Sequence, residues 1–237
     1  MQLSDWRERL AVAGYVVVPR VALDEDNHAL RALGVALGAV SSTGVTAGQP
    51  NVEQGAINRV EAMDVPRIDP GGRTVLSTSA DDFPLHTDDT FARAPVRSVL
   101  MHCWQADAAG GGVSRVAHVA DILVGLPPAT AERLRVADFP SPFGLAPVLF
   151  EPEAGDRGPC IRFNHRDFVS YGERYGPALA PDQTAALDQV LHAANRCARE
   201  MMLARGDCLI VDNRRVLHGR SAFAPRSGRL LKRLRVA

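Results

Sequence analysis

Several features that mark common classes of protein are scarce or missing in this sequence of 237 residues. The four cysteines, Cys103, Cys160, Cys197 and Cys208, stand far apart without a CxxC pair, which argues against a disulfide framework and a cysteine zinc site. Lysine occurs once, at Lys232, and 27 basic residues balance 27 acidic ones. A chain without excess charge has no electrostatic drive towards nucleic acid or an anionic membrane. We therefore expect neither partner.

Other absences bear on domain organisation. The sequence has no internal repeat, no low-complexity tract and no linker rich in Gly, Ser or Pro, while 46% of its residues are hydrophobic and 23% are charged. We therefore expect one globular domain over residues 1–237. The first ten residues, MQLSDWRERL, mix charges and contain no apolar run, so we expect neither a secretory signal nor an anchor, and a cytoplasmic location.

Short apolar or β-branched runs predict many strands, bounded by Gly and Pro. Such spacing is typical of a sandwich or barrel. The strands are expected within residues 15–20, 56–63, 74–79, 96–104, 114–119, 147–152, 160–164, 207–213 and 230–236. Apolar residues at helical spacing predict helices over 4–13, 23–37, 128–138 and 181–206, and residues 41–56 are expected to form a long loop. The predicted class is mainly β with flanking helices.

Two of the seven histidines have an aspartate two residues later, and the chain has no HExxH motif. The pairs are His86 with Asp88 in PLHTDDTF and His165 with Asp167 in RFNHRDF. On extended backbone, residues i and i+2 share a face, and a further histidine completes a two-histidine, one-carboxylate site that leaves positions open on Fe(II). We expect that histidine to be His218 in LIVDNRRVLHGRSAF, directly after an apolar strand.

PLHTDDTF, GGGVS, DNRRVLHGRSAF and a downstream GRLLKR together resemble the Fe(II)/2-oxoglutarate-dependent oxygenases of the taurine dioxygenase and clavaminate synthase group. The resemblance is strongest over residues 84–114 and 207–235. It implies a double-stranded β-helix, or jelly roll, with iron between its two sheets. It also implies that His86, Asp88 and His218 are the iron ligands.

The same resemblance implies how the cosubstrate binds. Arg229, 11 residues beyond His218, stands where these enzymes have an arginine that binds the C5 carboxylate of 2-oxoglutarate. Ser114 stands at the place of a threonine that hydrogen-bonds 2-oxoglutarate, and it keeps the hydroxyl. Arg233 shares the strand parity of Arg229, and we assign it a supporting role towards a substrate or cosubstrate carboxylate. The implied cofactors are Fe(II), 2-oxoglutarate and O2.

The implied activity is hydroxylation of a small amino acid or amino-acid derivative in specialised metabolism. The carboxylate at Asp88 favours hydroxylation over halogenation, because halogenating relatives have a small residue there. Desaturation or cyclisation with the same cofactors is the alternative. The DNRR and LLKR elements lean towards an amino-acid substrate. The candidates for lining its pocket are Asn58, Arg59, Glu61, Ser77, Thr78, Ser79 and Asp89.

Alternatives to this assignment lie in the second HxD pair and in other classes of protein. A ligand set of His165, Asp167 and His218 is disfavoured, because the predicted helix leaves no room for jelly-roll strands between its ligands. The RFNHRDF segment then lines the pocket or forms a surface turn. One alternative class is a non-catalytic sandwich protein that binds a metal or a small acid. Another is a cupin-like metal enzyme that needs no keto acid and would therefore not use Arg229.

Overall fold

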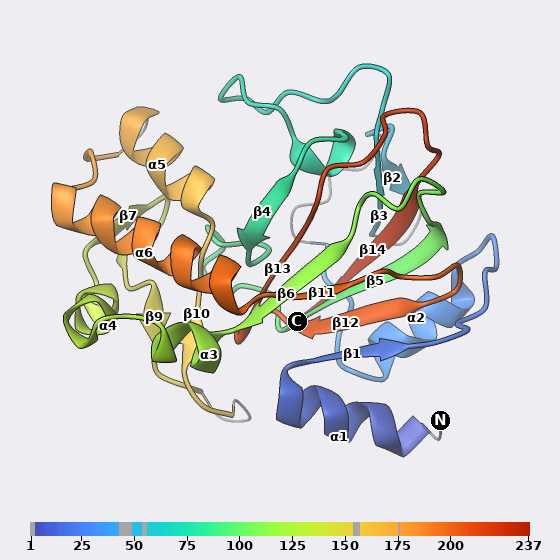
Figure 1. Ribbon diagram of the computed structural model, residues 1–237, viewed down its shortest axis with the longest axis horizontal. Coiled ribbons are helices and arrows are strands. Elements are labelled where there is room, and N and C mark those ends of the chain that lie inside the picture. The colour runs from blue at the N-terminus through green and yellow to red at the C-terminus, as the bar shows by residue number, and fades with distance from the viewer. Residues whose placement is uncertain (1–2, 43–48, 54–55, 154–156, 175) are drawn as a thin grey trace.

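Two antiparallel sheets face each other at the centre of the molecule, and helices cover their outer faces (Figure 1). The computed structural model describes residues 3–42, 49–53, 56–153, 157–174 and 176–237. This arrangement confirms the predicted class, which is mainly β with flanking helices, and the jelly-roll architecture.

The larger sheet has six strands in the order β1-β12-β5-β14-β3-β2. They are β1 (Tyr15–Val18), β12 (Cys208–Asp212), β5 (Ser98–Gln105), β14 (Leu230–Val236), β3 (Ile57–Glu61) and β2 (Val52–Glu53). The central strands β12 and β5 read CLIVD and SVLMHCWQ. Such nearly continuous apolar runs fit strands that are covered on both faces.

The smaller sheet has four strands in the order β11-β6-β13-β4. They are β11 (Arg199–Met201), β6 (Ser114–His118), β13 (Val216–Arg220) and β4 (Phe83–His86). Two hairpins lie outside the main sheets, formed by β7 (Phe139–Ser141) with β8 (Gly144–Ala146) and by β9 (Leu149–Phe150) with β10 (Cys160–Ile161).

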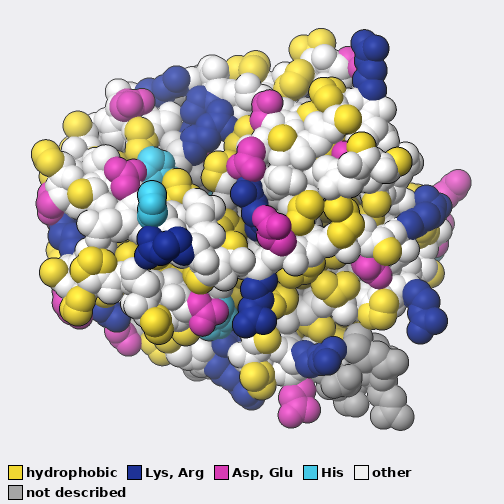
Figure 2. Space-filling model, in the orientation of Figure 1, with side chains coloured by type: hydrophobic (Ala, Val, Ile, Leu, Met, Phe, Trp, Pro, Cys, Tyr) yellow, Lys and Arg dark blue, Asp and Glu magenta, His cyan; other side chains and the backbone are white. Residues whose placement is uncertain are grey.

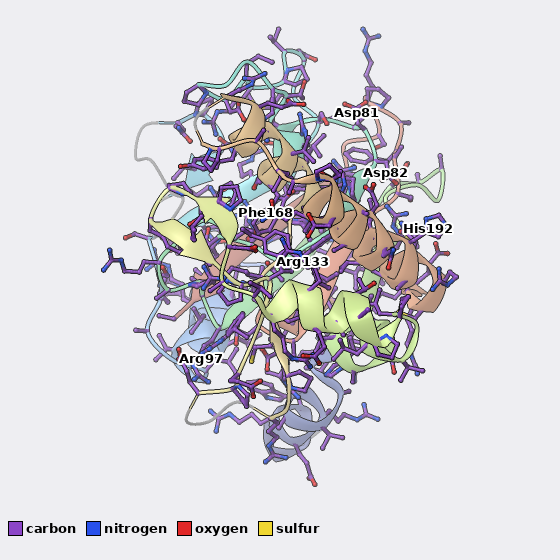
Figure 3. All side chains as sticks on the ribbon, turned by 90° about the vertical axis from the view of Figure 1, so that its left-hand side faces the viewer. Asp81, Asp82, Arg97, Arg133, Phe168 and His192 are labelled. Atoms are coloured by element: carbon purple, nitrogen blue, oxygen red, sulfur yellow. The ribbon has the colours of Figure 1, made fainter. Side chains whose placement is uncertain are left out.

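Helices pack against the outer face of each sheet. The larger sheet carries α1 (Leu3–Ala13) and α2 (His28–Val35). The smaller sheet carries α3 (Val119–Val124), α4 (Pro128–Arg135), α5 (His165–Arg174) and α6 (Pro181–Cys197). Figure 3 looks onto this second group and labels Phe168 of α5, which packs edge-on against Phe139 of β7. A short 3-10 helix, η1 (Leu76–Thr78), precedes β4.

Strand alternation divides the apolar side chains among three clusters. In β12, Cys208 and Ile210 face α1 and α2, while Leu209 and Val211 face the smaller sheet. In β13, Val216 faces the larger sheet, and the next residue along the strand joins the cluster under α3 to α6. The space between the sheets is therefore apolar at one end, and the polar site described below occupies its other end.

Some expected elements differ from the structure. Residues 74–79 were predicted as a strand, but only Thr74 forms a β-bridge, to Ile68, and Leu76–Thr78 form a 3-10 helix. Arg220 binds the carbonyls of Leu76 and Ser79. The helix predicted over 181–206 ends at Cys197 and is followed by β11. The predicted loop over 41–56 lies partly outside the described residues. None of the described helices is long and apolar enough to cross a membrane.

Candidate metal centre

Strand parity brings the predicted site residues into the space between the sheets. Ser114 on β6, His86 on β4 and His218 on β13 share the inward parity of the smaller sheet. His86 and His218 are also direct cross-strand partners in the β4–β13 pair. From the opposite sheet, Arg229 and Arg233 have the parity of the inward-facing β14 residues. All five side chains are buried.

The two imidazoles meet the Asp88 carboxylate in one compact group. His86 Nε2 lies 3.4 Å from Asp88 Oδ1, and His218 Nε2 lies 3.6 Å from the same oxygen. The ring centroids of the histidines are 4.6 Å apart. Within the described part of the chain, these are the three residues whose candidate ligand atoms gather as a metal site would require, all within 4.8 Å of one another.

The protonation of both histidines suits metal binding. His86 Nδ1 lies 2.9 Å from the Pro84 carbonyl, which fixes the proton there, while the buried His86 Nε2 makes no hydrogen bond with any described residue. Burial and the neighbouring His86 lower the pKa of His218 to about 4, which keeps this imidazole neutral. Two imidazoles and one carboxylate form the donor set of non-haem ferrous iron, so these residues fit Fe(II).

Asp88 is positioned by an amide side chain rather than by a strand. It lies in the turn after β4, so the parity argument covers His86 but not Asp88. Asn213, in the turn between β12 and β13, accepts a hydrogen bond from the Asp88 N–H at 2.7 Å and donates to the Asp88 carbonyl at 2.9 Å. Its amide also donates to the Val96 carbonyl at 3.0 Å. Asn213 thus fixes both ends of the loop that carries Asp88.

The two carboxylate oxygens of Asp88 have different surroundings. Oδ1 faces the imidazoles and accepts a hydrogen bond from Arg233 Nη1 at 3.2 Å, whereas Oδ2 lies 2.8 Å from Arg235 Nε and 3.1 Å from the same Arg233 nitrogen. Burial alone would raise the pKa of Asp88, but the guanidinium groups of Arg233 and Arg235 outweigh it and hold the pKa well below its usual value. Arg235 is itself held by Asn58 at 2.8 Å. Asp88 is therefore anionic, with one oxygen available to a metal.

Arg229 lies beside the glycine-rich segment before β6. Its Nη2 donates to the Gly112 carbonyl at 3.1 Å, and its guanidinium stacks over Phe223 at 5.0 Å. Its Nη1 is buried without a hydrogen-bond partner among the described residues. Gly112 has a φ of +66°, and a Cβ there would come within 2.2 Å of Arg229 Nε. The glycine is therefore needed for the close approach of the arginine, and Ser114 follows two residues later.

One wall of the site is tied down by Arg220 of β13. Its guanidinium donates to the Leu76 carbonyl at 2.9 Å, the Ser79 carbonyl at 2.6 Å, and the Asp81 carbonyl. These bonds hold η1 against the site. The resulting cleft measures about 420 Å³. It is lined by Val75, Leu76, Ser77, Phe83, His86, Thr87, Asp88, Asp89, Thr90, Phe91, Ala92, Asn164, Asp167, Arg233 and Arg235.

Only some of the residues that we predicted to line the substrate pocket do line the cleft. Ser77 and Asp89 line the cleft. Arg59 instead forms an ion pair with Glu61 at 2.7 Å. The arginines of DNRR point elsewhere: Arg215 donates to carbonyls of α1, and the neighbouring Arg214 stacks on Phe150 and pairs with Glu153. The motif therefore contributes its asparagine to the site, while its arginines join distant segments of the chain.

The second HxD pair lies on α5 and brings no metal ligands together. His165 Nε2 lies 2.7 Å from Asp188 Oδ1 of α6, and Asp167 Oδ1 lies 3.1 Å from Arg73 Nη1. On a helix, residues i and i+2 point in different directions. Asp167 does line the cleft, which fits the expectation that this segment contributes to a pocket.

Sequence reasoning missed three residues that shape the site. Arg235 has the same parity as Arg229 and Arg233, so strand alternation could have identified it. Arg220 follows His218 by two residues and has its inward parity. Asn213 gave no signal beyond its place in DNRR, because a side chain that clamps a distant loop has no local pattern.

Comparison with known proteins places this geometry in a family context. The sequence profile of the family described as Taurine catabolism dioxygenase TauD, TfdA family matches residues 2–235. A curated relative, the L-asparagine oxygenase of Streptomyces coelicolor (strain ATCC BAA-471 / A3(2) / M145), is 28% identical over 152 residues. That match covers 60% of this chain and 42% of the relative, so it spans less than half of the relative's length.

Solved structures share the fold over nearly the whole chain. The structure of asparagine oxygenase in complex with Fe(II), 2S,3S-3-hydroxyasparagine and succinate has a TM-score of 0.72 and 22% sequence identity, covering 99% of this chain and 77% of that one. The structure of the non-heme iron oxygenase OrfP in complex with Fe and alpha-ketoglutaric acid has a TM-score of 0.69 and 16% identity, with 99% and 79% covered. At these identities the likeness establishes the fold.

Proposed function

The chain belongs to the taurine catabolism dioxygenase TauD, TfdA family, and from this premise we propose that it is an Fe(II)- and 2-oxoglutarate-dependent dioxygenase that hydroxylates a small amino acid or amino-acid derivative. The observation that carries the proposal is the group formed by His86, Asp88 and His218, which lies between the same two sheets as the buried Arg229. Relatives with hydroxyasparagine and succinate, or with alpha-ketoglutaric acid, at iron support the substrate class and the cofactors.

Some of the site residues would bind the metal, and others would bind the cosubstrate. His86 and His218 would hold Fe(II) through Nε2, and Asp88 through Oδ1. Bound Fe(II) and 2-oxoglutarate would supply the activation of O2, with succinate and carbon dioxide as coproducts. The Nη1 of Arg229, which has no hydrogen-bond partner among the described residues, can donate to the distal carboxylate of 2-oxoglutarate. The hydroxyl of Ser114, two residues after Gly112, can form a further hydrogen bond with 2-oxoglutarate.

The positioning residues keep that arrangement rigid. Arg235 holds Oδ2 of Asp88 and Arg233 Nη1 contacts both of its oxygens, so the carboxylate is fixed in one orientation with Oδ1 towards the imidazoles. Asn213 fixes the backbone of Asp88, and Arg220 fixes the wall formed by η1. Because Asp88 fills a coordination position with oxygen, hydroxylation is favoured over halogenation.

Succinate formation tests the proposal directly. The purified protein is expected to convert 2-oxoglutarate to succinate only when Fe(II) and O2 are present, and faster when a substrate from an amino-acid panel is added. Omitting iron, or replacing His86 with alanine, should reduce succinate to background. If the His86→Ala protein formed succinate as fast as the wild type, the iron site would be assigned wrongly.

Gly112→Ala is expected to raise the KM for 2-oxoglutarate by about tenfold, with a smaller effect on kcat. The added methyl group overlaps Arg229, so the guanidinium must shift away from the place where it would bind the cosubstrate. A loss of about 1.4 kcal/mol in binding corresponds to this tenfold change. Steady-state kinetics at varied 2-oxoglutarate concentration would measure it.

A matched control lies two residues earlier. Gly110 has a φ of +80°, and a Cβ there meets nothing within 4 Å. Gly110→Ala therefore introduces comparable backbone strain without a collision. Equal KM values for the two variants would show that strain in the loop, rather than displacement of Arg229, causes the change.

We also propose that residues 1–237 form a single oxygenase domain in the cytoplasm that binds neither nucleic acid nor membrane. The first point is supported by the three apolar clusters, which are joined by shared strands: β12 contributes to two of them and β13 to two. The balance of charge supports the last, and Figure 2 shows Lys and Arg side chains interspersed with Asp and Glu on one face.

A further inference from the structure

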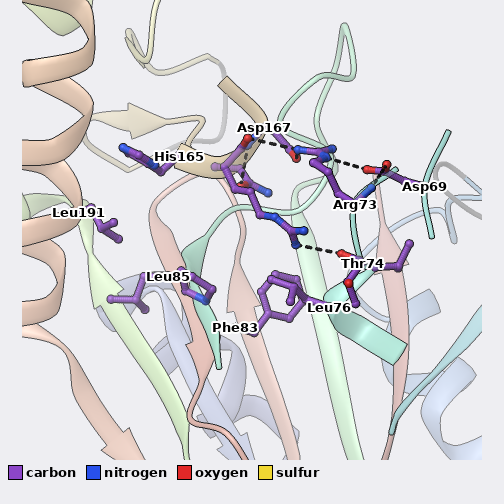
Figure 4. A pocket seen from close by; sticks show the side chains of 13 residues that line it. Asp69, Arg73, Thr74, Leu76, Phe83, Leu85, His165, Asp167 and Leu191 are labelled. Carbon is purple, nitrogen blue, oxygen red and sulfur yellow. Dashed lines mark hydrogen bonds and ion pairs between the residues drawn. The ribbon is translucent and has the colours of Figure 1, made fainter. Parts of the chain in front are cut away.

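A second hollow opens beside the cleft, on the far side of Phe83. It measures about 220 Å³, lies between η1, β4 and α5, and is shown in Figure 4. It shares Val75, Leu76, Phe83, Asn164 and Asp167 with the cleft, so the two hollows are adjacent. The ring of Phe83 stacks on His86, with centroids 4.1 Å apart. A molecule held in the hollow would therefore border a proposed iron ligand.

The walls of this hollow differ in polarity. Phe83, Leu76, Leu85 and Leu191 form an apolar side, and Asp167 lies across from them (Figure 4). The charged residues that also line the hollow have partners of their own, since Arg73 pairs with Asp69 and Asp167, and Arg166 donates to the Thr74 carbonyl. At about 220 Å³ the hollow is smaller than the roughly 300–1,000 Å³ of pockets for drug-sized ligands, so it suits a small metabolite. A ligand with a short apolar part and one cationic group would match both walls.

One carboxylate oxygen of Asp167 has no partner among the described residues. Its Oδ1 pairs with Arg73 at 3.1 Å, but Arg73 is also bound to Asp69 at 2.8 Å, so it serves two carboxylates. Asp167 Oδ2 makes no hydrogen bond or ion pair with a described residue, and the side chain is 30% exposed. Burial raises the pKa of Asp167 even though Arg73 and His86 act in the opposite direction. Asp167 thus shares its one ion-pair partner among the described residues, Arg73, with a second carboxylate.

We propose that Asp167 binds the ammonium group of an amino-acid substrate whose apolar part lies against Phe83 and Leu76. This inference rests on the proposed function and names the residue that selects the substrate. A carboxylate that is partly withdrawn from water forms a strong charge-assisted hydrogen bond with an ammonium group. Arg73, held by Asp69, is the positioning residue that keeps Asp167 facing the cleft. His165 takes no part, since it pairs with Asp188.

The test compares ligands that differ only in the ammonium group. Calorimetric titrations of the whole protein, with and without Fe(II) and 2-oxoglutarate under argon, use the twenty proteinogenic L-amino acids. They also use the des-amino acids and N-acetyl derivatives of those that bind. We expect the free amino acids to bind roughly 10- to 150-fold more tightly, the range for a hydrogen bond to a charged group. Lysine acetylated at Nα or at Nε identifies which ammonium group binds.

Asp167→Asn is expected to remove this preference, while Asp188→Asn keeps it. Asp188 lies on α6 and lines neither hollow, although it pairs with His165, which borders the smaller one, so its substitution removes the same charge without altering Asp167. Equal affinity of the wild type for amino acids and their des-amino forms would overturn the proposal, whether or not the variant folds. So would an unchanged preference in Asp167→Asn. Failure of the proposed function would be seen in a different measurement. In that case the wild type would form no succinate from 2-oxoglutarate with Fe(II) and O2, whether or not an amino acid is added.

Discussion

The Asp88→Ala protein is expected to lose both iron-dependent turnover and a large part of its stability. Substrate-triggered succinate formation should fall to background, because the metal loses its only carboxylate ligand among the three proposed donors. The metal-free variant should be less stable than the wild type by about 3–5 kcal/mol, since Arg233 and Arg235 then lose a buried counter-charge. Fe(II) titration and urea unfolding of the metal-free protein measure the two effects.

His86→Ala is the matched control that separates these effects. It removes a proposed iron ligand but leaves both guanidinium groups paired with Asp88. It should therefore abolish turnover while costing less stability than Asp88→Ala. If the metal-free Asp88→Ala protein unfolded at the same urea concentration as the wild type, the ion pairs around Asp88 would contribute nothing measurable to the fold.

Arg229→Ala is expected to raise the KM for 2-oxoglutarate by about 30-fold to several thousandfold. Truncating one partner of a buried charged pair costs about 2–5 kcal/mol, and each 1.4 kcal/mol is a factor of ten. Arg229→Lys should recover only part of the affinity, because an ammonium group cannot form two parallel hydrogen bonds with a carboxylate. Steady-state kinetics at saturating iron and amino-acid substrate measure the change.

Arg226→Ala provides the comparison for this prediction, because Arg226 is exposed on the same loop and carries the same charge. Its KM for 2-oxoglutarate should match the wild type. An unchanged KM in Arg229→Ala would show that the cosubstrate carboxylate is held elsewhere.

The sequence predicted those parts of the site that depend on strand alternation. His86, His218 and Arg233 point between the sheets because a strand has a period of two, and that period is visible in the sequence. Asp88 reaches the same place through a turn fixed by Asn213, more than a hundred residues away. A contact of that kind is decided by tertiary packing and leaves no local pattern.

The segment with the second HxD pair shows where tertiary contacts outweigh the local sequence pattern. RFNHRDF contains aromatic residues that are compatible with a strand, but residues from His165 onwards form α5. The helix buries Phe168 against Phe139, and this tertiary contact outweighs local propensity. The strand prediction for residues 74–79 was wrong for a related reason. Their β-branched residues predict a strand, but Arg220 binds the Leu76 and Ser79 carbonyls, which a neighbouring strand would need.

The chain leaves the smaller sheet after β6 and returns to it at β11, which pairs directly with β6 through Arg199 and Val116. Residues 119–198 therefore form a cassette whose two ends meet on adjacent strands and whose interior has its own apolar cluster. The spacing of His86 and His218 is set by the β4–β13 ladder and does not depend on the length of this cassette. Evolution can thus exchange the cassette, which carries Asp167, and alter substrate choice while the oxidative chemistry is inherited unchanged.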